Sequence, residues 1–244
     1  MDALYPNWQA PHNIRALTTL RQGGVSKAPY DSFNLGVHVE DDENAVKINR
    51  TLLVEQFALP QYPLFLNQTH STRVLSLPDA GRDPHADAVY TDKPNQVCLV
   101  MTADCLPVLF TNKQGTEVGA AHAGWRGLCD GVLEQTVKCF QCPPDEIIAW
   151  FGPAIGPTAF QVGMDVVAQF SAQDAQAEQA FVTDPNATGK YLGNLYQIAT
   201  QRLNKLGITR ISGGEHCTYK EQDKFFSFRR DGKTGRMASL IWFE

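Results

Sequence analysis

Short apolar runs dominate the middle of the chain. Residues 96–101 (QVCLVM), 106–110 (LPVLF), 118–123 (VGAAHA) and 146–152 (EIIAWFG) each have the length of one strand, and turn-forming residues separate them. These runs are almost continuously apolar, which is typical of strands buried on both faces of a sheet. We therefore expect a central sheet in this part of the chain.

Apolar positions at helical spacing occur on both sides of these runs. Residues 42–58 begin with acidic side chains and then place apolar ones at helical intervals. Residues 191–207 gather leucines on one helical face, with Gly207 as the expected end of the helix. Two further helices are predicted, over residues 128–140 and 164–181.

This alternation of strands and helices predicts a mixed α/β (α+β) fold with a central mixed sheet flanked by helices. We expect one domain over residues 1–244. The last part of the chain, residues 225–243, is expected to add two strands joined across a glycine-bearing turn.

Composition narrows the class of protein. The formal net charge of −5 argues against a general nucleic-acid binder, which normally has a basic face. The first residues lack the pattern of a signal peptide, and no apolar run reaches the length of a membrane span. The six cysteines are scattered, unlike those of a secreted disulfide scaffold. We expect a cytoplasmic protein with reduced thiols, a monomer or homodimer, without nucleic-acid or membrane partners.

Three metal-binding side chains interrupt or border the apolar runs. His70 lies in NQTHS, Cys105 in TADC and His122 in AAHAG, each beside small or turn-forming residues. Thiolate and imidazole are good ligands for zinc. Three protein ligands would leave a fourth position for water, as in catalytic zinc sites, where the pKa of bound water falls to about 7.

The same residues allow other chemistries. Cys105 and His122 could form a nucleophile–base pair oriented by Asp104 or another acid, as in a metal-independent cysteine hydrolase or amidase. Two histidines and a cysteine are also a blue-copper ligand set, although a four-copper oxidase needs more imidazoles than six, and no His-x-His pair occurs. A metal-stabilised binding module without enzyme activity is the third alternative.

Several blocks together resemble one known family. NQTHS, ADAVYT, TADCLPVLF, AAHAGWRGL, GPAIGP, CTY and FFSFRRDGKTGRMASLIW occur in the order typical of YfiH-like, laccase-domain proteins, from about Arg21 to Trp242. These proteins were once described as polyphenol oxidases and are now regarded as purine nucleoside phosphorylases. The resemblance implies a mixed α/β fold, also likened to cysteine hydrolases. It further implies a zinc site of His70, Cys105 and His122, with copper as the other possible metal.

The resemblance also implies two reactions in one pocket. One is phosphorolysis of adenosine, inosine, guanosine and methylthioadenosine, with a purine nucleoside and phosphate as partners. The other is adenosine deamination, in which zinc-activated water attacks the base and a carboxylate moves protons. Asp87 and Asp104 are the candidates for that carboxylate.

Arginines are the candidates for binding substrate. Arg21 precedes a Gly-Gly turn, Arg126 lies at the start of a predicted helix, and Arg229 lies in FRRDG. Guanidinium groups and turn or helix amides bind phosphate well. Trp125 either stacks on a purine or belongs to the core.

Overall fold

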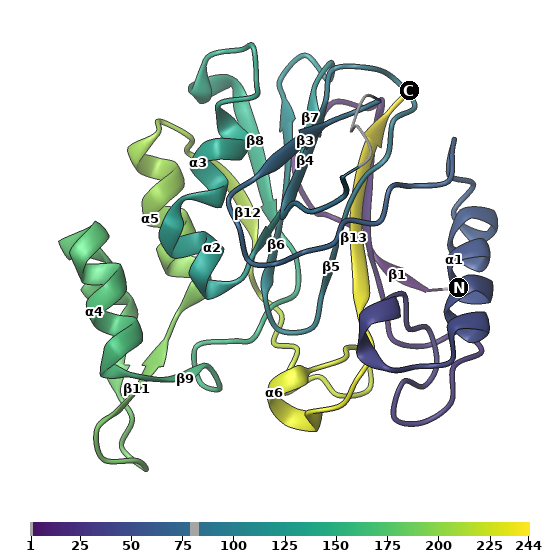
Figure 1. The fold of residues 1–244 in the computed structure, drawn as a ribbon. Helices are drawn as coiled ribbons and strands as arrows, with labels where there is room; N and C mark the ends of the chain where they lie inside the picture. Colours follow the sequence, from purple (N-terminus) through teal and green to yellow (C-terminus); the bar gives the residue numbers. More distant parts are fainter. Residues whose placement is uncertain (1, 79–82) are drawn as a thin grey trace.

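A six-stranded mixed sheet lies at the centre of the computed structural model, which describes residues 2–78 and 83–244 (Figure 1). Neighbouring strands pair antiparallel, except for the parallel pair at each edge. The strands of this central sheet, in order from one edge to the other, are β12 (Arg210–Gly213), β8 (Ile147–Phe151), β6 (Leu106–Asn112), β7 (Val118–Ala123), β4 (Ala88–Thr91) and β3 (Val74–Ser76). The predicted mixed α/β fold is confirmed.

Helices cover one face of this sheet (Figure 1). They are α2 (Trp125–Asp130), α3 (Val132–Val137), α4 (Met164–Gln173) and α5 (Leu195–Lys205). Side chains alternate between the two faces of a strand. In β6 the side chains of Val108 and Phe110 therefore join the core beneath the helices, while Leu109 between them joins a different core.

A second, four-stranded sheet covers the opposite face. Its order is β1 (Ala3–Leu4), β2 (Ile14–Thr19), β13 (Met237–Phe243) and β5 (Cys98–Thr102). Leu109 packs in the core between the two sheets, and α1 (Glu43–Gln56) covers the outer side of the second sheet (Figure 1). The central sheet thus has helices on one face and another sheet on the other.

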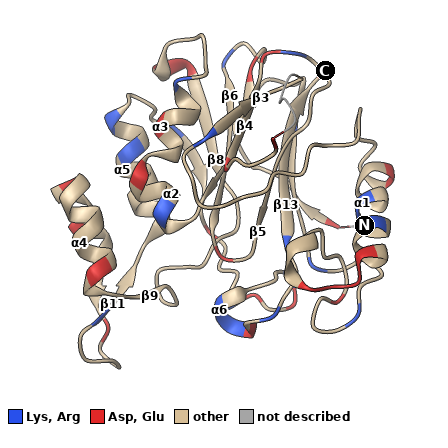
Figure 2. Cartoon of the chain, viewed as in Figure 1, with Lys and Arg blue, Asp and Glu red and all other residues tan. Residues whose placement is uncertain are grey.

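Shorter elements complete the chain. A small sheet has the order β10 (Phe181–Thr183), β11 (Lys190–Gly193) and β9 (Gln161–Gly163). The remaining helical turns are η1 (Val37–Val39), η2 (Pro144–Glu146), η3 (Ala175–Ala180) and α6 (Phe228–Asp231). Charged side chains lie mainly on helices and loops, and the strands carry few of them (Figure 2). None of the helices in the described part of the chain is long and apolar enough to cross a membrane.

Three predicted helices have different limits in the structure. The helix expected over 128–140 begins earlier, at Trp125, and is broken at Gly131, whose φ of 104° belongs to the left-handed region. The helix expected over 164–181 ends at Gln173, because Asp174 is extended and its side chain caps η3. The helix expected over 191–207 begins at Leu195, since the residues before it form β11.

The prediction of two final strands is wrong for the first of them. Only residues 237–243 form a strand, β13. The segment before it turns into α6, because the Ser227 side chain accepts a hydrogen bond from the backbone N–H of Arg230 and so caps this short helix. This turn matters for the site, because it places Arg229 at a cavity.

Candidate active site

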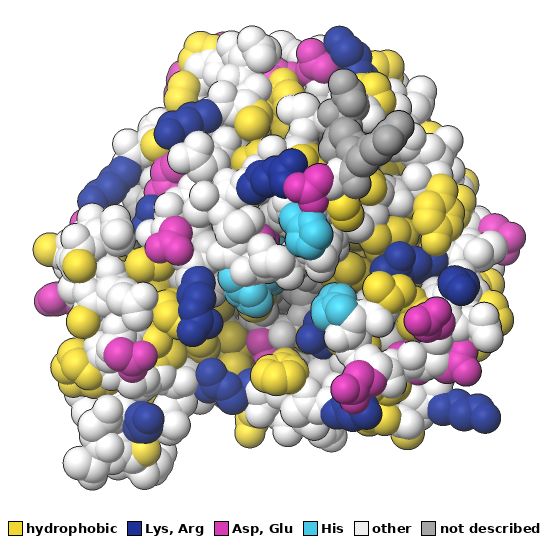
Figure 3. Space-filling view, viewed as in Figure 1, with side chains coloured by type: hydrophobic (Ala, Val, Ile, Leu, Met, Phe, Trp, Pro, Cys, Tyr) yellow, Lys and Arg dark blue, Asp and Glu magenta, His cyan; other side chains and the backbone are white. Residues whose placement is uncertain are grey.

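A cavity of about 420 Å³ opens beside the ends of the central strands, within the size range of small-molecule sites. In Figure 3 it is the hollow in the middle of the face, with histidine, basic and apolar side chains around it. His70, Cys105 and His122 line it together. The three residues singled out in the sequence therefore meet at one place.

Strand pairing brings Cys105 and His122 together. Cys105 directly precedes β6, and His122 lies near the end of β7. The two strands run antiparallel with Leu106 opposite Ala123 and Pro107 opposite His122. The end of one strand therefore meets the beginning of the other, and both side chains reach the same end of the sheet.

His70 reaches the cavity from a loop held by Asp87. The Asp87 carboxylate accepts hydrogen bonds from three successive backbone N–H groups, those of Thr69, His70 and Ser71, at 2.6–3.1 Å. It also accepts the Ser71 hydroxyl at 2.7 Å. These bonds hold His70 at a φ of 62°, a backbone conformation that costs a non-glycine residue about 1–3 kcal/mol.

Asp87 also orients His122. This fully buried carboxylate precedes β4 and accepts a 2.8 Å hydrogen bond from His122 Nδ1. The other ring nitrogen, Nε2, is therefore the one left for the cavity. Burial opposes ionisation of Asp87, but hydrogen bonds and the positive charge from His122, with further bonds from Ser71, lower its pKa to about 2.

The close approach of these side chains depends on Gly124. A methyl group at this position would lie 2.9 Å from His70 Nε2 and 3.1 Å from Cys105 Sγ, closer than ordinary contacts permit. Gly124 has an ordinary extended backbone, with φ of −61° and ψ of 155°. A glycine is therefore needed here because it has no side chain, and not because of its backbone conformation.

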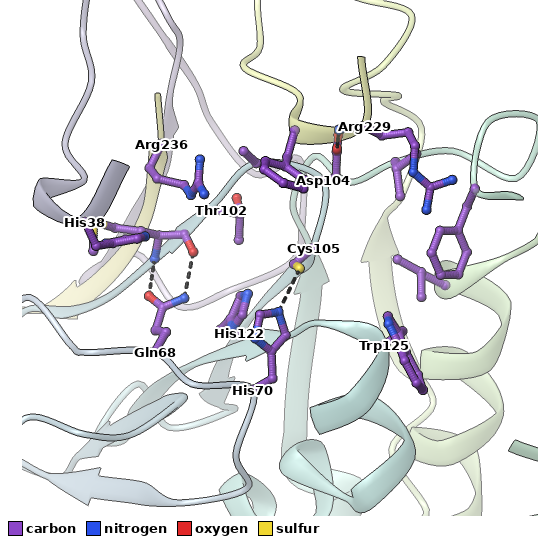
Figure 4. Close-up of a pocket in the computed structure, with 16 residues that line it drawn as sticks. His38, Gln68, His70, Thr102, Asp104, Cys105, His122, Trp125, Arg229 and Arg236 are labelled. Carbon is purple, nitrogen blue, oxygen red and sulfur yellow. Dashed lines mark hydrogen bonds between the residues drawn. The ribbon is translucent and has the colours of Figure 1, made fainter. Parts of the chain in front are cut away.

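The donor atoms fit a zinc ion. All three lie within 4.8 Å of one another, and Cys105 Sγ is 3.6 Å from His70 Nε2 (Figure 4). Tetrahedral zinc, with bonds of about 2.3 Å to sulfur and about 2.0–2.1 Å to nitrogen, separates such a pair by about 3.6 Å. One thiolate and two imidazoles, one of them oriented by a carboxylate, are also a donor set suited to zinc.

Without a metal, Cys105 and His122 favour their charged forms. Burial opposes a thiolate, but the positive charge of His122 and hydrogen bonds from both histidines lower the pKa of Cys105 to about 6. Burial likewise opposes an imidazolium, but the charge of Cys105 and the bond to Asp87 raise the pKa of His122 to about 9. The thiol is thus prepared to lose its proton, either to a metal or to the neighbouring histidine.

The cavity has two chemically different sides (Figure 4). Trp125 and Arg229 lie on one side, and the Arg229 guanidinium lies over the ring of Phe160, which also lines the cavity. The other apolar lining residues include Ile155, Leu195 and Phe228. The other side is polar and basic, with His38, Gln68, Thr102 and Arg236. In Figure 4, Cys105, His70 and His122 lie between the two sides.

The predicted carboxylates have different positions. Asp87 lies behind His122 and is not among the described residues that line the cavity. Asp104 does line it, but its two oxygens accept 2.6 Å hydrogen bonds from Thr218 Oγ1 and from the backbone N–H of Arg229. Both carboxylates are therefore engaged with the protein.

Of the three predicted arginines, the structure brings only Arg229 to the cavity. Arg126 stacks on the ring of Trp125, 4.3 Å from its centroid, and is not among the described lining residues. Arg21 lies in a separate charged hollow, where it donates a hydrogen bond to the Gln222 carbonyl and lies near Asp31.

Three residues that were not predicted from the sequence also line the cavity: Arg236, His38 and Gln68. Arg236 directly precedes a seven-residue buried strand, which is a signal of the kind that singled out Cys105. His38 and Gln68 lie in segments without recognisable periodicity, and only the folded chain brings them to the site.

Comparisons with known proteins identify the family of this chain. The family described as "Multi-copper polyphenol oxidoreductase laccase" matches residues 15–244. A Haemophilus influenzae protein named purine nucleoside phosphorylase is 69% identical over 244 residues, which is 100% of each chain. An Escherichia coli protein named purine nucleoside phosphorylase YfiH is 52% identical over 98% of each chain.

Solved structures of related proteins share the fold. A Neisseria meningitidis protein superimposes with a TM-score of 0.96 at 48% identity, covering 100% of both chains. YlmD from Geobacillus stearothermophilus superimposes with a TM-score of 0.89 at 30% identity, again over 100% of both chains. The chain therefore belongs to the YfiH family of laccase-domain proteins.

Proposed function

We propose that this chain is a zinc-dependent purine nucleoside phosphorylase and that adenosine deamination is a second activity of the same cavity. The names of the relatives support the first activity. The observation that carries the proposal is the convergence of His70, Cys105 and His122 on a cavity with an aromatic side and a basic side. The proposed unit is one domain over residues 1–244.

His70, Cys105 and His122 would hold the zinc ion. When bound, zinc supplies a Lewis acid and lowers the pKa of water at its open position. The surrounding residues fix these ligands. Asp87 holds the backbone of His70 and the ring of His122. Gly124 leaves space beside His70 and Cys105, whose Nε2 and Sγ atoms lie 3.6 Å apart.

In phosphorolysis, a phosphate oxygen bonds to C1′ of the ribose while the bond from C1′ to the purine nitrogen breaks. The products are ribose 1-phosphate and a free purine, which takes up a proton. Trp125 and Phe160 offer aromatic surface to the purine. Arg229, whose guanidinium lies 5.7 Å from the Phe160 centroid, places positive charge at the edge of that surface.

In deamination, water adds to C6 of adenine and ammonia leaves, which requires protons to move between them. We assign Asp87 to orienting His122, because it accepts the hydrogen bond from His122 Nδ1 and is not among the described residues that line the cavity. Asp104, which lines the cavity, is the carboxylate proposed to move protons.

The test combines metal analysis with product analysis. Purified protein is incubated with adenosine, with and without inorganic phosphate, and the products are separated by chromatography. We expect about one zinc per chain, adenine and ribose 1-phosphate only with phosphate, and inosine in either case, with hypoxanthine from phosphorolysis of that inosine when phosphate is present. Cys105→Ala should lose zinc and both products, whereas Cys139→Ala, at a half-buried cysteine away from the cavity, should keep them. Zinc and full turnover in Cys105→Ala would refute the assignment.

A cysteine hydrolase is the second candidate function. The chain Asp87–His122–Cys105 has the order of a catalytic triad, and the lowered thiol pKa favours a nucleophilic thiolate. Such an enzyme would keep its activity when the metal is chelated and would lose it on alkylation of Cys105. The zinc enzyme would be inactivated by chelation and reactivated by added zinc.

A further inference from the structure

The polar side of the cavity contains an arginine without a carboxylate partner. The ion pairs in the described part of the chain involve other arginines, such as Arg202 with Glu134, and none involves Arg236. Arg236 is half-buried, and its Nη1 donates only to the backbone carbonyls of Thr234 and Gly235. Charge removed from water is normally paired, so this guanidinium has capacity for an anion.

The protein fixes the position of this arginine. The backbone N–H of Arg236 donates to Asn34 Oδ1 at 2.9 Å, and the same oxygen accepts from the N–H of Gly36. A methyl group on Gly36 would lie 2.8 Å from Arg236 Cγ, so the glycine leaves space for the arginine side chain. The guanidinium is therefore held in place before any ligand binds, which reduces the entropy lost on binding.

A buried hydroxyl without a partner lies beside it. Thr102 ends β5 and lies opposite Met237 of β13, the residue that follows Arg236. Figure 4 shows the side chains of Thr102 and Arg236 on the same side of the cavity. Its side chain lines the cavity, the residue is only 1% exposed, and its Oγ1 has no hydrogen-bond partner among the described residues. Leaving a buried hydroxyl unpaired costs about 1–3 kcal/mol.

Neighbouring groups keep the region rigid and the arginine charged. The Gln68 amide donates to the carbonyl of Met101 and accepts its N–H, both at 2.7 Å, which fixes the end of β5. Burial lowers the pKa of Arg236, while the negative charges of Cys105 and Asp104 oppose that decrease. The guanidinium of Arg236 thus stays positively charged, and the end of β5 beside it is held in place.

We propose that Arg236 and Thr102 form an oxyanion subsite that binds the attacking inorganic phosphate. The inference rests on the proposed phosphorylase activity and deepens it. The guanidinium donates to phosphate oxygens, and the Thr102 hydroxyl gains the partner that it lacks in the protein. His38, which also lines this side, lies at its exposed rim.

This placement of phosphate orients the nucleoside. With phosphate beside Arg236 and the purine against Trp125 and Phe160, C1′ lies between them, next to Cys105, His70 and His122 (Figure 4). A phosphate oxygen then approaches C1′ from the side opposite the departing purine. Arg229 lies on the purine side and is not part of the phosphate subsite.

The test measures phosphate binding directly. Inorganic phosphate is titrated calorimetrically into purified wild-type protein and into Arg236→Gln, Thr102→Val, Arg229→Gln and the surface control Arg210→Gln. We expect Arg236→Gln to weaken binding by roughly 10- to 100-fold, as expected when hydrogen bonds from a charged group are lost, and to raise the phosphate KM but not the nucleoside KM. Arg229→Gln and Arg210→Gln should bind phosphate as wild type does.

Thr102→Val separates binding from folding. It removes a hydroxyl without a protein partner, so the melting temperature should stay the same or rise while phosphate binding weakens. A lower melting temperature with unchanged phosphate affinity would overturn the role of Thr102. Unchanged phosphate affinity in Arg236→Gln, or no phosphate binding by wild type, would overturn the subsite.

Two further outcomes distinguish a subsite for inorganic phosphate from one for a phosphorylated substrate. If adenosine 5′-monophosphate bound through Arg236 while inorganic phosphate did not, the subsite would serve a substrate's own phosphate, contrary to the proposal. If phosphate bound through Arg236 but no ribose 1-phosphate formed, the proposed phosphorylase function would fail while the subsite itself stood.

Discussion

Gly124→Ala is a test of how closely the candidate ligands must approach one another. The φ of −61° and ψ of 155° at this position suit alanine, so the substitution introduces no backbone strain. The added methyl group would instead lie 2.9 Å from His70 Nε2 and 3.1 Å from Cys105 Sγ. The change therefore acts on two of the three donor atoms and adds only one carbon.

The required movement follows from these distances. Ordinary contacts of a Cβ atom begin at 3.4 Å, and the nearest atom, His70 Cδ2, would lie 2.4 Å from the added methyl group. The rigid imidazole ring must therefore move by about 1.0 Å, the difference between 3.4 and 2.4 Å, and its Nε2 moves with it. Zinc ligand distances tolerate about 0.2 Å. We expect zinc affinity to fall by roughly 10- to 100-fold, and turnover by up to about 100-fold. Loss of glycine from the start of α2 should lower the free energy of unfolding by only about 1 kcal/mol.

The assay is zinc content by mass spectrometry together with phosphorolysis of adenosine. Gly119→Ala is the matched control, because Gly119 lies on the same strand as His122 and its added methyl would find its nearest atoms at 3.4 Å. The control should keep its zinc and activity. Stoichiometric zinc and near wild-type turnover in Gly124→Ala would refute the proposed site geometry.

Other changes test the remaining contacts. Asp87→Asn should lower zinc affinity by about 10- to 100-fold, measured by competition with a chromogenic chelator. Because the pKa of Asp87 is lowered from 3.8 to about 2, its contribution of about 2 kcal/mol is present above about pH 4 and is lost toward pH 2. The difference between wild type and Asp87→Asn in urea unfolding should therefore narrow over that interval. In chelator-treated protein, alkylation of Cys105 should accelerate as the pH rises through about 6, and zinc should protect the thiol; acceleration only near pH 9 would contradict the lowered pKa. Trp125→Ala should raise the nucleoside KM without changing phosphate affinity; an unchanged KM would place the purine elsewhere.

The spacing of apolar residues along the chain predicted the main buried strands and helices well. The apolar run at 118–123 coincides with β7, and the acidic start at residue 42 marks the cap of α1, where the Asp42 side chain accepts two backbone N–H groups. These features depend on neighbouring residues and are therefore readable from local sequence. Gly131 and Asp174 were harder to interpret, because a residue that ends one helix and starts another leaves the helical spacing nearly intact.

The candidate site was only partly predictable for a related reason. Cys105 and His122 interrupt apolar runs, and this contrast makes them visible. Arg236 and Thr102 come from different strands that lie far apart in the sequence and meet through the pairing of β13 with β5. The missing hydrogen-bond partner of Thr102 is a property of the packed structure, and no residue pattern encodes it.

Zinc titration is the sharpest test of whether the three ligands hold a metal that the reaction requires. Chelator-treated protein receives zinc in steps, and ribose 1-phosphate formation from adenosine is followed at each step. We predict that activity rises linearly and stops rising at one zinc per chain, and that Cys105→Ala stays inactive throughout. Full activity before any zinc is added would contradict a zinc-dependent phosphorylase.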